Sequence, residues 1–124
     1  MNYGWLDDDT DDTEWRRVVL HEFGHALGAI HEHQNPQGGI QWNVDKVYAY
    51  FGGPPNNWSK AQIDFNILQK YSVAQLNGSA FDIRSIMLFT FPPVLIVSGA
   101  QLPNNTVLSV GDKRFIARIY PKPA

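Results

Sequence analysis

The stretch His21–His31 reads HEFGHALGAIH and contains three histidines at fixed spacing. Histidines four residues apart project from the same face of a helix, so His21 and His25 are expected to reach one metal ion. Gly28 is expected to adopt a positive φ angle, which ends the helix and returns His31 to the same ion. Three nitrogen ligands with one open coordination position are typical of a hydrolytic zinc site.

Glu22 follows the first histidine of this motif and lies about 100° around the helix from it. The carboxylate therefore stands beside the metal and not on it, which makes Glu22 the candidate general base and one Zn²⁺ the predicted cofactor. The alternative is an amphipathic helix with surface histidines, but the glycine and third histidine at fixed offsets make a chance match rare. His33 lies outside the motif, and we interpret it as a supporting or surface residue, not a ligand.

The composition describes one small globular domain. Of 124 residues, 44% are hydrophobic and 13% aromatic, which supports a packed core and argues against disorder. A formal net charge of −2, with dispersed Lys and Arg, gives no reason to expect a nucleic acid or an anionic membrane as partner. No apolar run approaches the roughly 20 residues that span a bilayer. The absence of cysteine excludes disulfides and cysteine-ligated zinc.

The predicted organisation is a single, partial catalytic domain over residues 1–124, with the active-site helix at about 12–28 and a C-terminal subdomain at about 29–124. The segment Met1–Thr13 shows no basic region followed by an apolar stretch, so no signal peptide is visible. Its aspartates are interpreted as a solvated linker that places negative charge at the helix N-terminus. A calcium site is the alternative, although the spaced ligands and glycine of a calcium loop are missing.

The predicted secondary structure is mostly helical, with helices expected at about 12–28, 44–51, 60–70 and 110–120. Each begins at a capping residue, with Asn43 and Ser109 as simple caps and capping boxes expected at Asp11–Glu14 and Ser59–Gln62. Residues 81–91 are expected to be irregular or extended. The aromatic-rich run Asn2–Leu6 predicts one strand, which needs a sheet that this chain scarcely supplies. The predicted fold class is therefore α+β with most of the usual sheet absent.

With these motifs in place, the chain resembles the astacin-like metzincins, a family of zinc metallopeptidases. His21–His31 matches the family's zinc motif in full, and Glu32 matches the glutamate that follows it. Ser85–Met87 matches the start of the family's SIMHY sequence, the Met-turn beneath the metal. Residues 108–113 and 119–121 are similar to the family's terminal helix. The resemblance implies a metzincin-like zincin catalytic domain.

The resemblance also implies roles for individual residues. By position, these are His21, His25 and His31 as zinc ligands, Glu22 as general base, Met87 as the hydrophobic floor of the site, Gly28 and Glu32 as structural supports, and Phe89 at the place of the family's tyrosine. Without the zinc motif, Met87 would be interpreted as an ordinary core methionine. A surface carboxylate remains the alternative for Glu32.

The chain departs from the family in two ways. Where the family has His-Tyr after the methionine, this chain has Leu88 and Phe89, and phenylalanine has no oxygen to approach zinc or stabilise an oxyanion. We therefore expect weakened activity. The strands that precede the zinc helix in the family are also missing, so we expect a fragment of a longer protein, with a reduced form as the alternative.

The predicted function is a zinc-dependent endopeptidase that hydrolyses peptide bonds with a zinc-bound water activated by Glu22. The predicted partner is a peptide or protein substrate, and family resemblance implies secretion. The alternative is a catalytically silent zinc-binding pseudopeptidase that acts as a binding module. Phe89 and the missing sheet favour this alternative, whereas the intact Glu22 opposes it.

Overall fold

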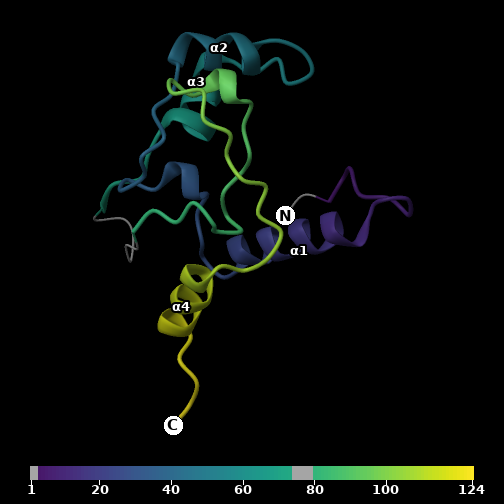
Figure 1. The fold of residues 1–124 in the computed structure, drawn as a ribbon, viewed down its shortest axis with the longest axis vertical. Helices are drawn as coiled ribbons and strands as arrows, with labels where there is room; N and C mark the ends of the chain where they lie inside the picture. Colours follow the sequence, from purple (N-terminus) through teal and green to yellow (C-terminus); the bar gives the residue numbers. More distant parts are fainter. Residues whose placement is uncertain (1–2, 74–79) are drawn as a thin grey trace. The chain divides into compact units, whose positions relative to one another are not determined.

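The computed structural model describes residues 3–73 and 80–124, and these form two compact units. Unit 1 comprises residues 1–32, 82–89 and 103–124, and unit 2 comprises residues 33–81 and 90–102. In chain order the elements are α1 (Asp12–Ala26), the 3-10 turn η1 (Glu32–Gln34), α2 (Val44–Gly52), α3 (Lys60–Ile63), the π-helical turn η2 (Asp64–Leu68), the 3-10 turn η4 (Pro93–Leu95) and α4 (Val110–Ile119) (Figure 1).

Helix α1 begins where the capping pattern predicts. The carboxylate of Asp11 accepts a hydrogen bond from the backbone N–H of Thr13 at 2.6 Å. Glu14 does not complete a capping box, because its carboxylate pairs with Arg17 through two hydrogen bonds of 2.6 and 2.7 Å. The helix ends two residues before Gly28, which has a φ of +93°. This is a conformation that glycine adopts without steric cost.

Helix α4 also begins as predicted, with a complete capping box. Ser109 Oγ accepts from the backbone N–H of Asp112, and Asp112 accepts from the backbone N–H of Ser109, both at 2.9 Å. Within unit 1, residues of α1 and α4 line a cavity of about 520 Å³. Its walls are almost wholly apolar, and they include Phe23 and Leu27, of which 54% and 38% remain exposed. The apolar side chains of α1 are thus only partly buried.

Unit 2 contains α2, α3, η2 and η4. The predicted helix at 44–51 is confirmed, and its cap is the Asn43 side chain. The predicted capping box at Ser59 is confirmed too, but the helix it opens passes at Asp64 into the π-helical turn and ends at Leu68. The apolar side chains that pack the core of this unit are almost fully buried: Val47, Ile63, Ile67 and Leu95.

The predicted α+β fold class, with an N-terminal strand at Asn2–Leu6, is wrong for the described residues. Residues 3–6 form a turn, in which the backbone N–H of Leu6 donates to the carbonyl of Tyr3 at 3.0 Å. Strand pairing within the described ranges is limited to an isolated antiparallel bridge between Trp42 and Ile96. A strand requires a partner to satisfy its backbone, and without one the aromatic run bonds locally.

The predicted irregular segment at 81–91 is confirmed, since it contains turns but neither helix nor strand. None of the helices in the described ranges combines the length and the hydropathy that a membrane span requires.

Candidate metal centre

Three histidines of unit 1 form a cluster that fits a metal ion. His21 and His25 project from α1, and His31 follows the turn at Gly28. The candidate ligand atoms of the three side chains all lie within 4.8 Å of one another. One pair of these atoms, Nε2 of His25 and Nε2 of His31, is 3.0 Å apart. Over residues 3–73 and 80–124, this is the one group of His, Cys or acidic side chains with such spacing.

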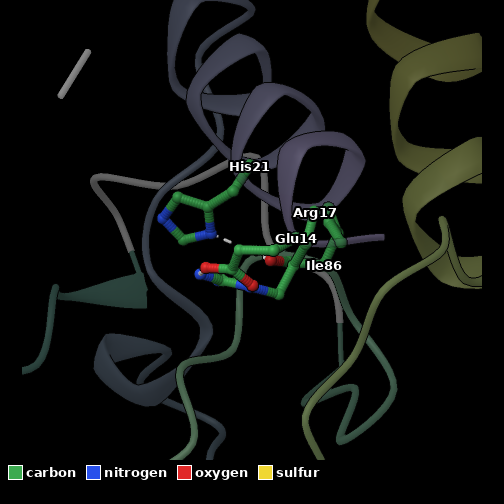
Figure 2. Close-up of polar contacts among 4 residues, drawn as sticks. All are labelled: Glu14, Arg17, His21 and Ile86. Carbon is green, nitrogen blue, oxygen red and sulfur yellow. Dashed lines mark hydrogen bonds and ion pairs between the residues drawn. The ribbon is translucent and has the colours of Figure 1, made fainter. Parts of the chain in front are cut away.

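The other ring nitrogens hold two of these imidazoles in place. His21 Nδ1 donates to the carbonyl of Ile86 at 2.9 Å, as Figure 2 shows, and His25 Nδ1 donates to the carbonyl of Ala29 at 2.9 Å. Because a carbonyl only accepts, each Nδ1 must carry the proton, and the Nε2 lone pair faces the cluster. This is how metal-ligating histidines are usually oriented.

The chemistry of the donor set supports a bound metal. His21 is 2% exposed, and its Nε2 is buried without a hydrogen-bond partner. Buried polar atoms are nearly always satisfied, so this nitrogen points to a ligand outside the polypeptide. Three neutral imidazoles suit zinc and other divalent transition metals. The residues present therefore fit the predicted Zn²⁺.

Burial of the His21 ring lowers its pKa, and the hydrogen bond to Ile86 opposes this effect only in part. The neutral form that binds metal is therefore favoured near neutral pH. The charges of His25 and, to a smaller extent, Arg17 lower the pKa of His21 further, whereas the charge of Glu22 raises it. Figure 2 shows Arg17 with Glu14, and its hydrogen bonds lower the pKa of the Glu14 carboxyl.

The turn at Gly28 connects the helix to the third histidine. Its backbone N–H donates to the carbonyl of His25 at 2.9 Å, and the N–H of Ala29 donates to the carbonyl of Gly24 at 2.9 Å. This reversal also brings the Ala29 carbonyl to the His25 ring. The local sequence thus builds both the chain reversal and the support for one imidazole.

Two further residues of the sequence prediction lie on this cluster. The Phe89 ring lies with its centroid 4.6 Å from that of His21 and 4.6 Å from that of His31. It places a hydrocarbon ring where the family's phenol is expected. Glu22 is partly buried on α1 beside His21. These positions are compatible with the predicted roles, which remain predictions.

Met87 and Glu32 support the site from within unit 1. Met87 is 4% exposed, and its side chain fills the space beside Gly24 of α1. Glu32 is buried, which argues against a surface carboxylate. Its N–H donates to the Met87 carbonyl at 3.0 Å, and its carboxylate accepts from the N–H of Asp82 at 2.9 Å.

His33 lies outside the cluster and belongs to the core of unit 2. It is 2% exposed, so it is not a surface residue, and its Nε2 donates to the carbonyl of Asn66 at 2.9 Å. Two carbonyls that orient the imidazoles, those of Ala29 and Ile86, were not predicted from the sequence. A backbone carbonyl carries no residue-type signal, so only the turn at the motif glycine could have indicated the first.

Two solved structures of myroilysin are similar to this chain. One, "Structure of myroilysin", is 52% identical, with a TM-score of 0.93 over 100% of this chain and 60% of that chain. The other, "Crystal structure of myroilysin", is also 52% identical, with a TM-score of 0.63 over 98% of this chain and 53% of that chain. The chain thus spans little more than half the length of these relatives. No family model matches the chain, and neither does any curated protein.

Proposed function

We propose that this chain carries the zinc site of a metal-dependent endopeptidase of the astacin-like metzincin type. The observation that carries the proposal is the three-histidine cluster, in which His21 presents a buried Nε2 without a partner. The similarity to myroilysin, a metallopeptidase, supports a peptidase with peptide or protein substrates. Secretion forms part of the proposal through the family resemblance alone.

The residues have distinct tasks in this mechanism. His21, His25 and His31 hold the zinc, which when bound supplies Lewis acidity. Glu22 accepts a proton from the water that attacks the peptide carbonyl and then delivers a proton to the leaving amine as the C–N bond breaks. Gly28 and the buried Glu32 keep two parts of the site in place: the third ligand and residues 82–88, called the Met87 segment.

The second candidate function is a zinc-binding module without catalysis. Phe89 favours it, because its ring contacts His21 and His31 and offers no oxygen to an oxyanion. Glu22 opposes it, because a silent site has no chemical need for a base at that position.

The deciding experiment compares zinc content and cleavage of a broad peptide library for wild type, Glu22→Gln and Glu14→Gln. Glu14 is a matched control, because it lies on the same helix, pairs with Arg17 and does not belong to the cluster. We expect stoichiometric zinc in all three proteins and a loss of turnover of about 10²–10⁴-fold in Glu22→Gln alone.

Normal cleavage by Glu22→Gln would disprove its assigned role. Stoichiometric zinc without cleavage in any of the proteins would point to a binding module or to a fragment that lacks part of the catalytic domain. Absence of zinc from the wild-type protein would disprove the proposed metal site.

A further inference from the structure

Residues 82–88 form no helix or strand, yet side chains from elsewhere in unit 1 hold their backbone. The backbone N–H of Ile86 donates to the Asp112 carboxylate at 2.8 Å, and the Ile86 carbonyl accepts from His21 Nδ1 at 2.9 Å. One residue therefore connects helix α4 to a candidate metal ligand on α1. We propose that Asp112 is a positioning residue for the metal centre and acts through Ile86 on His21. This inference rests on the proposed metal site.

Asp112 does more than its capping box requires. A capping box needs the side chain at this position to accept one hydrogen bond, from the backbone N–H of the capping residue. The Asp112 carboxylate accepts that bond from Ser109, and it accepts two others, from Ser85 Oγ at 2.6 Å and from the Ile86 N–H at 2.8 Å. The two additional bonds reach the Met87 segment, 26 and 27 residues earlier in the chain.

These contacts join the half-buried carboxylate of Asp112 to residues in the interior of unit 1, where hydrogen bonds are less replaceable by water than at the surface. Ser85 and Ile86 are 2% and 3% exposed, and His21 is 2% exposed. Hydrogen bonds to an ionised carboxylate are stronger than those between neutral groups. An asparagine at position 112 would lose the charge and turn an N–H₂ group towards one of these donors. The Ser85 hydroxyl would lose its acceptor. The bonds from the Ile86 and Ser109 N–H groups to the remaining oxygen would weaken because the amide carries no charge, so the segment would be held less firmly.

Other bonds limit the resulting movement, so the variant is expected to fold. The Asn105 side chain donates to the carbonyls of Ile83 and Ser85, both at 2.9 Å. The N–H of Met87 donates to Ser85 Oγ at 3.0 Å. Loss of the Asp112 contacts should therefore tilt the Ile86 carbonyl and leave the rest of the segment attached.

The tilt matters because the Ile86 carbonyl sets the direction of the His21 ring. Loss of a group that orients a metal ligand typically weakens metal affinity about 10–100-fold. Asp112 touches neither the histidines nor a reacting group in this arrangement, so its effect should appear in metal binding before it appears in chemistry.

The test uses the full 124-residue chain as wild type, Asp112→Asn and Gln62→Ala. Gln62 is the matched control, because it completes the capping box of α3 in unit 2 by accepting from the backbone N–H of Ser59. The zinc dissociation constant is measured by competition with a chromophoric chelator, and the visible absorption spectrum of the Co²⁺ form reports ligand geometry. We expect zinc binding about 10–100-fold weaker and an altered cobalt spectrum in Asp112→Asn, and no change in either for Gln62→Ala.

A folded Asp112→Asn protein with wild-type zinc affinity and cobalt spectrum would overturn this inference while leaving the metal site intact. Equal weakening in Gln62→Ala would overturn it too, because general loss of a helix cap would then suffice. Wild type that binds no zinc would overturn the metal site and this inference together. If circular dichroism shows Asp112→Asn unfolded, Asp112→Glu decides, since it keeps the charge but moves the carboxylate by one methylene from the Ile86 N–H, and wild-type affinity there overturns the inference.

Discussion

Among single residues, Phe89 packs directly against the candidate metal centre. Its ring contacts two of the three imidazoles, with centroid separations of 4.6 Å to His21 and 4.6 Å to His31. A hydrocarbon there shields the histidines from water but provides no hydrogen bond. The sequence alone predicted the missing oxygen, whereas the ring contacts needed the structure.

Phe89→Tyr is expected to raise turnover on a peptide substrate by as much as about 10²-fold, because it adds a donor that can approach the developing oxyanion. The measurement is kcat at equal zinc loading for wild type and variant. Phe23→Tyr is the control, since it adds the same oxygen to a phenylalanine that is 54% exposed on α1. Unchanged turnover in Phe89→Tyr would show that the phenol has no use here.

At the scale of elements, α1 and the Met87 segment approach closely at Gly24. A Cβ at this position would overlap Met87 Sδ and would lie 3.2 Å from its Cε. Glycine in a helix interior costs up to about 1 kcal/mol relative to alanine, so the packing must outweigh the propensity. The glycine inside the zinc motif is thus explained by the methionine that packs against it.

Gly24→Ala should therefore destabilise the chain by about 1–3 kcal/mol, although alanine is the better helix former. Denaturant unfolding measures this free energy. Gly39→Ala, where a Cβ would meet no atom within 4 Å, should change it by less than about 0.5 kcal/mol. In a protein that already carries Met87→Ala, Gly24→Ala should cost little further stability, because the side chain it would clash with is gone. If the two changes in unfolding free energy were strictly additive, the packing argument would be wrong.

The helices could be predicted from sequence because their starts depend on local chemistry. Asn43, Ser59 and Ser109 each bond to a backbone N–H within three residues, so their caps follow from short patterns. The strand predicted at Asn2–Leu6 failed because pairing depends on a distant partner, which no local pattern supplies. The π-helical turn after α3 has no signal that we recognise in the sequence.

The same distinction holds for the site in the whole molecule. The three histidines meet because their spacing on one helix and one turn is local. The groups that orient the His21 imidazole are distant from it in the sequence. His21 bonds to the carbonyl of Ile86, 65 residues away, and Asp112 bonds to the backbone N–H of the same Ile86, 26 residues earlier in the chain. Sequence spacing therefore predicted the three-histidine cluster, while the groups that orient its imidazoles had to be located in the structure.

The apolar cavity between α1 and α4 affects how the isolated chain should behave in solution. Its walls carry Phe23 and Leu27 in partly exposed positions. Contiguous exposed apolar surface of this kind binds amphiphilic dyes and promotes association. The natively folded chain should therefore enhance the fluorescence of 8-anilinonaphthalene-1-sulfonate several-fold, without denaturant.

Phe23→Ser should reduce this signal, whereas Phe65→Ser, at a phenylalanine 64% exposed in unit 2, should not. Equal losses in both variants would show that the dye reports scattered surface and not the cavity. Ammonium sulfate strengthens apolar association. Wild type should therefore precipitate at a lower ammonium sulfate concentration than the Phe23→Ser variant does. Preparations of this chain should accordingly be kept dilute and free of such salts.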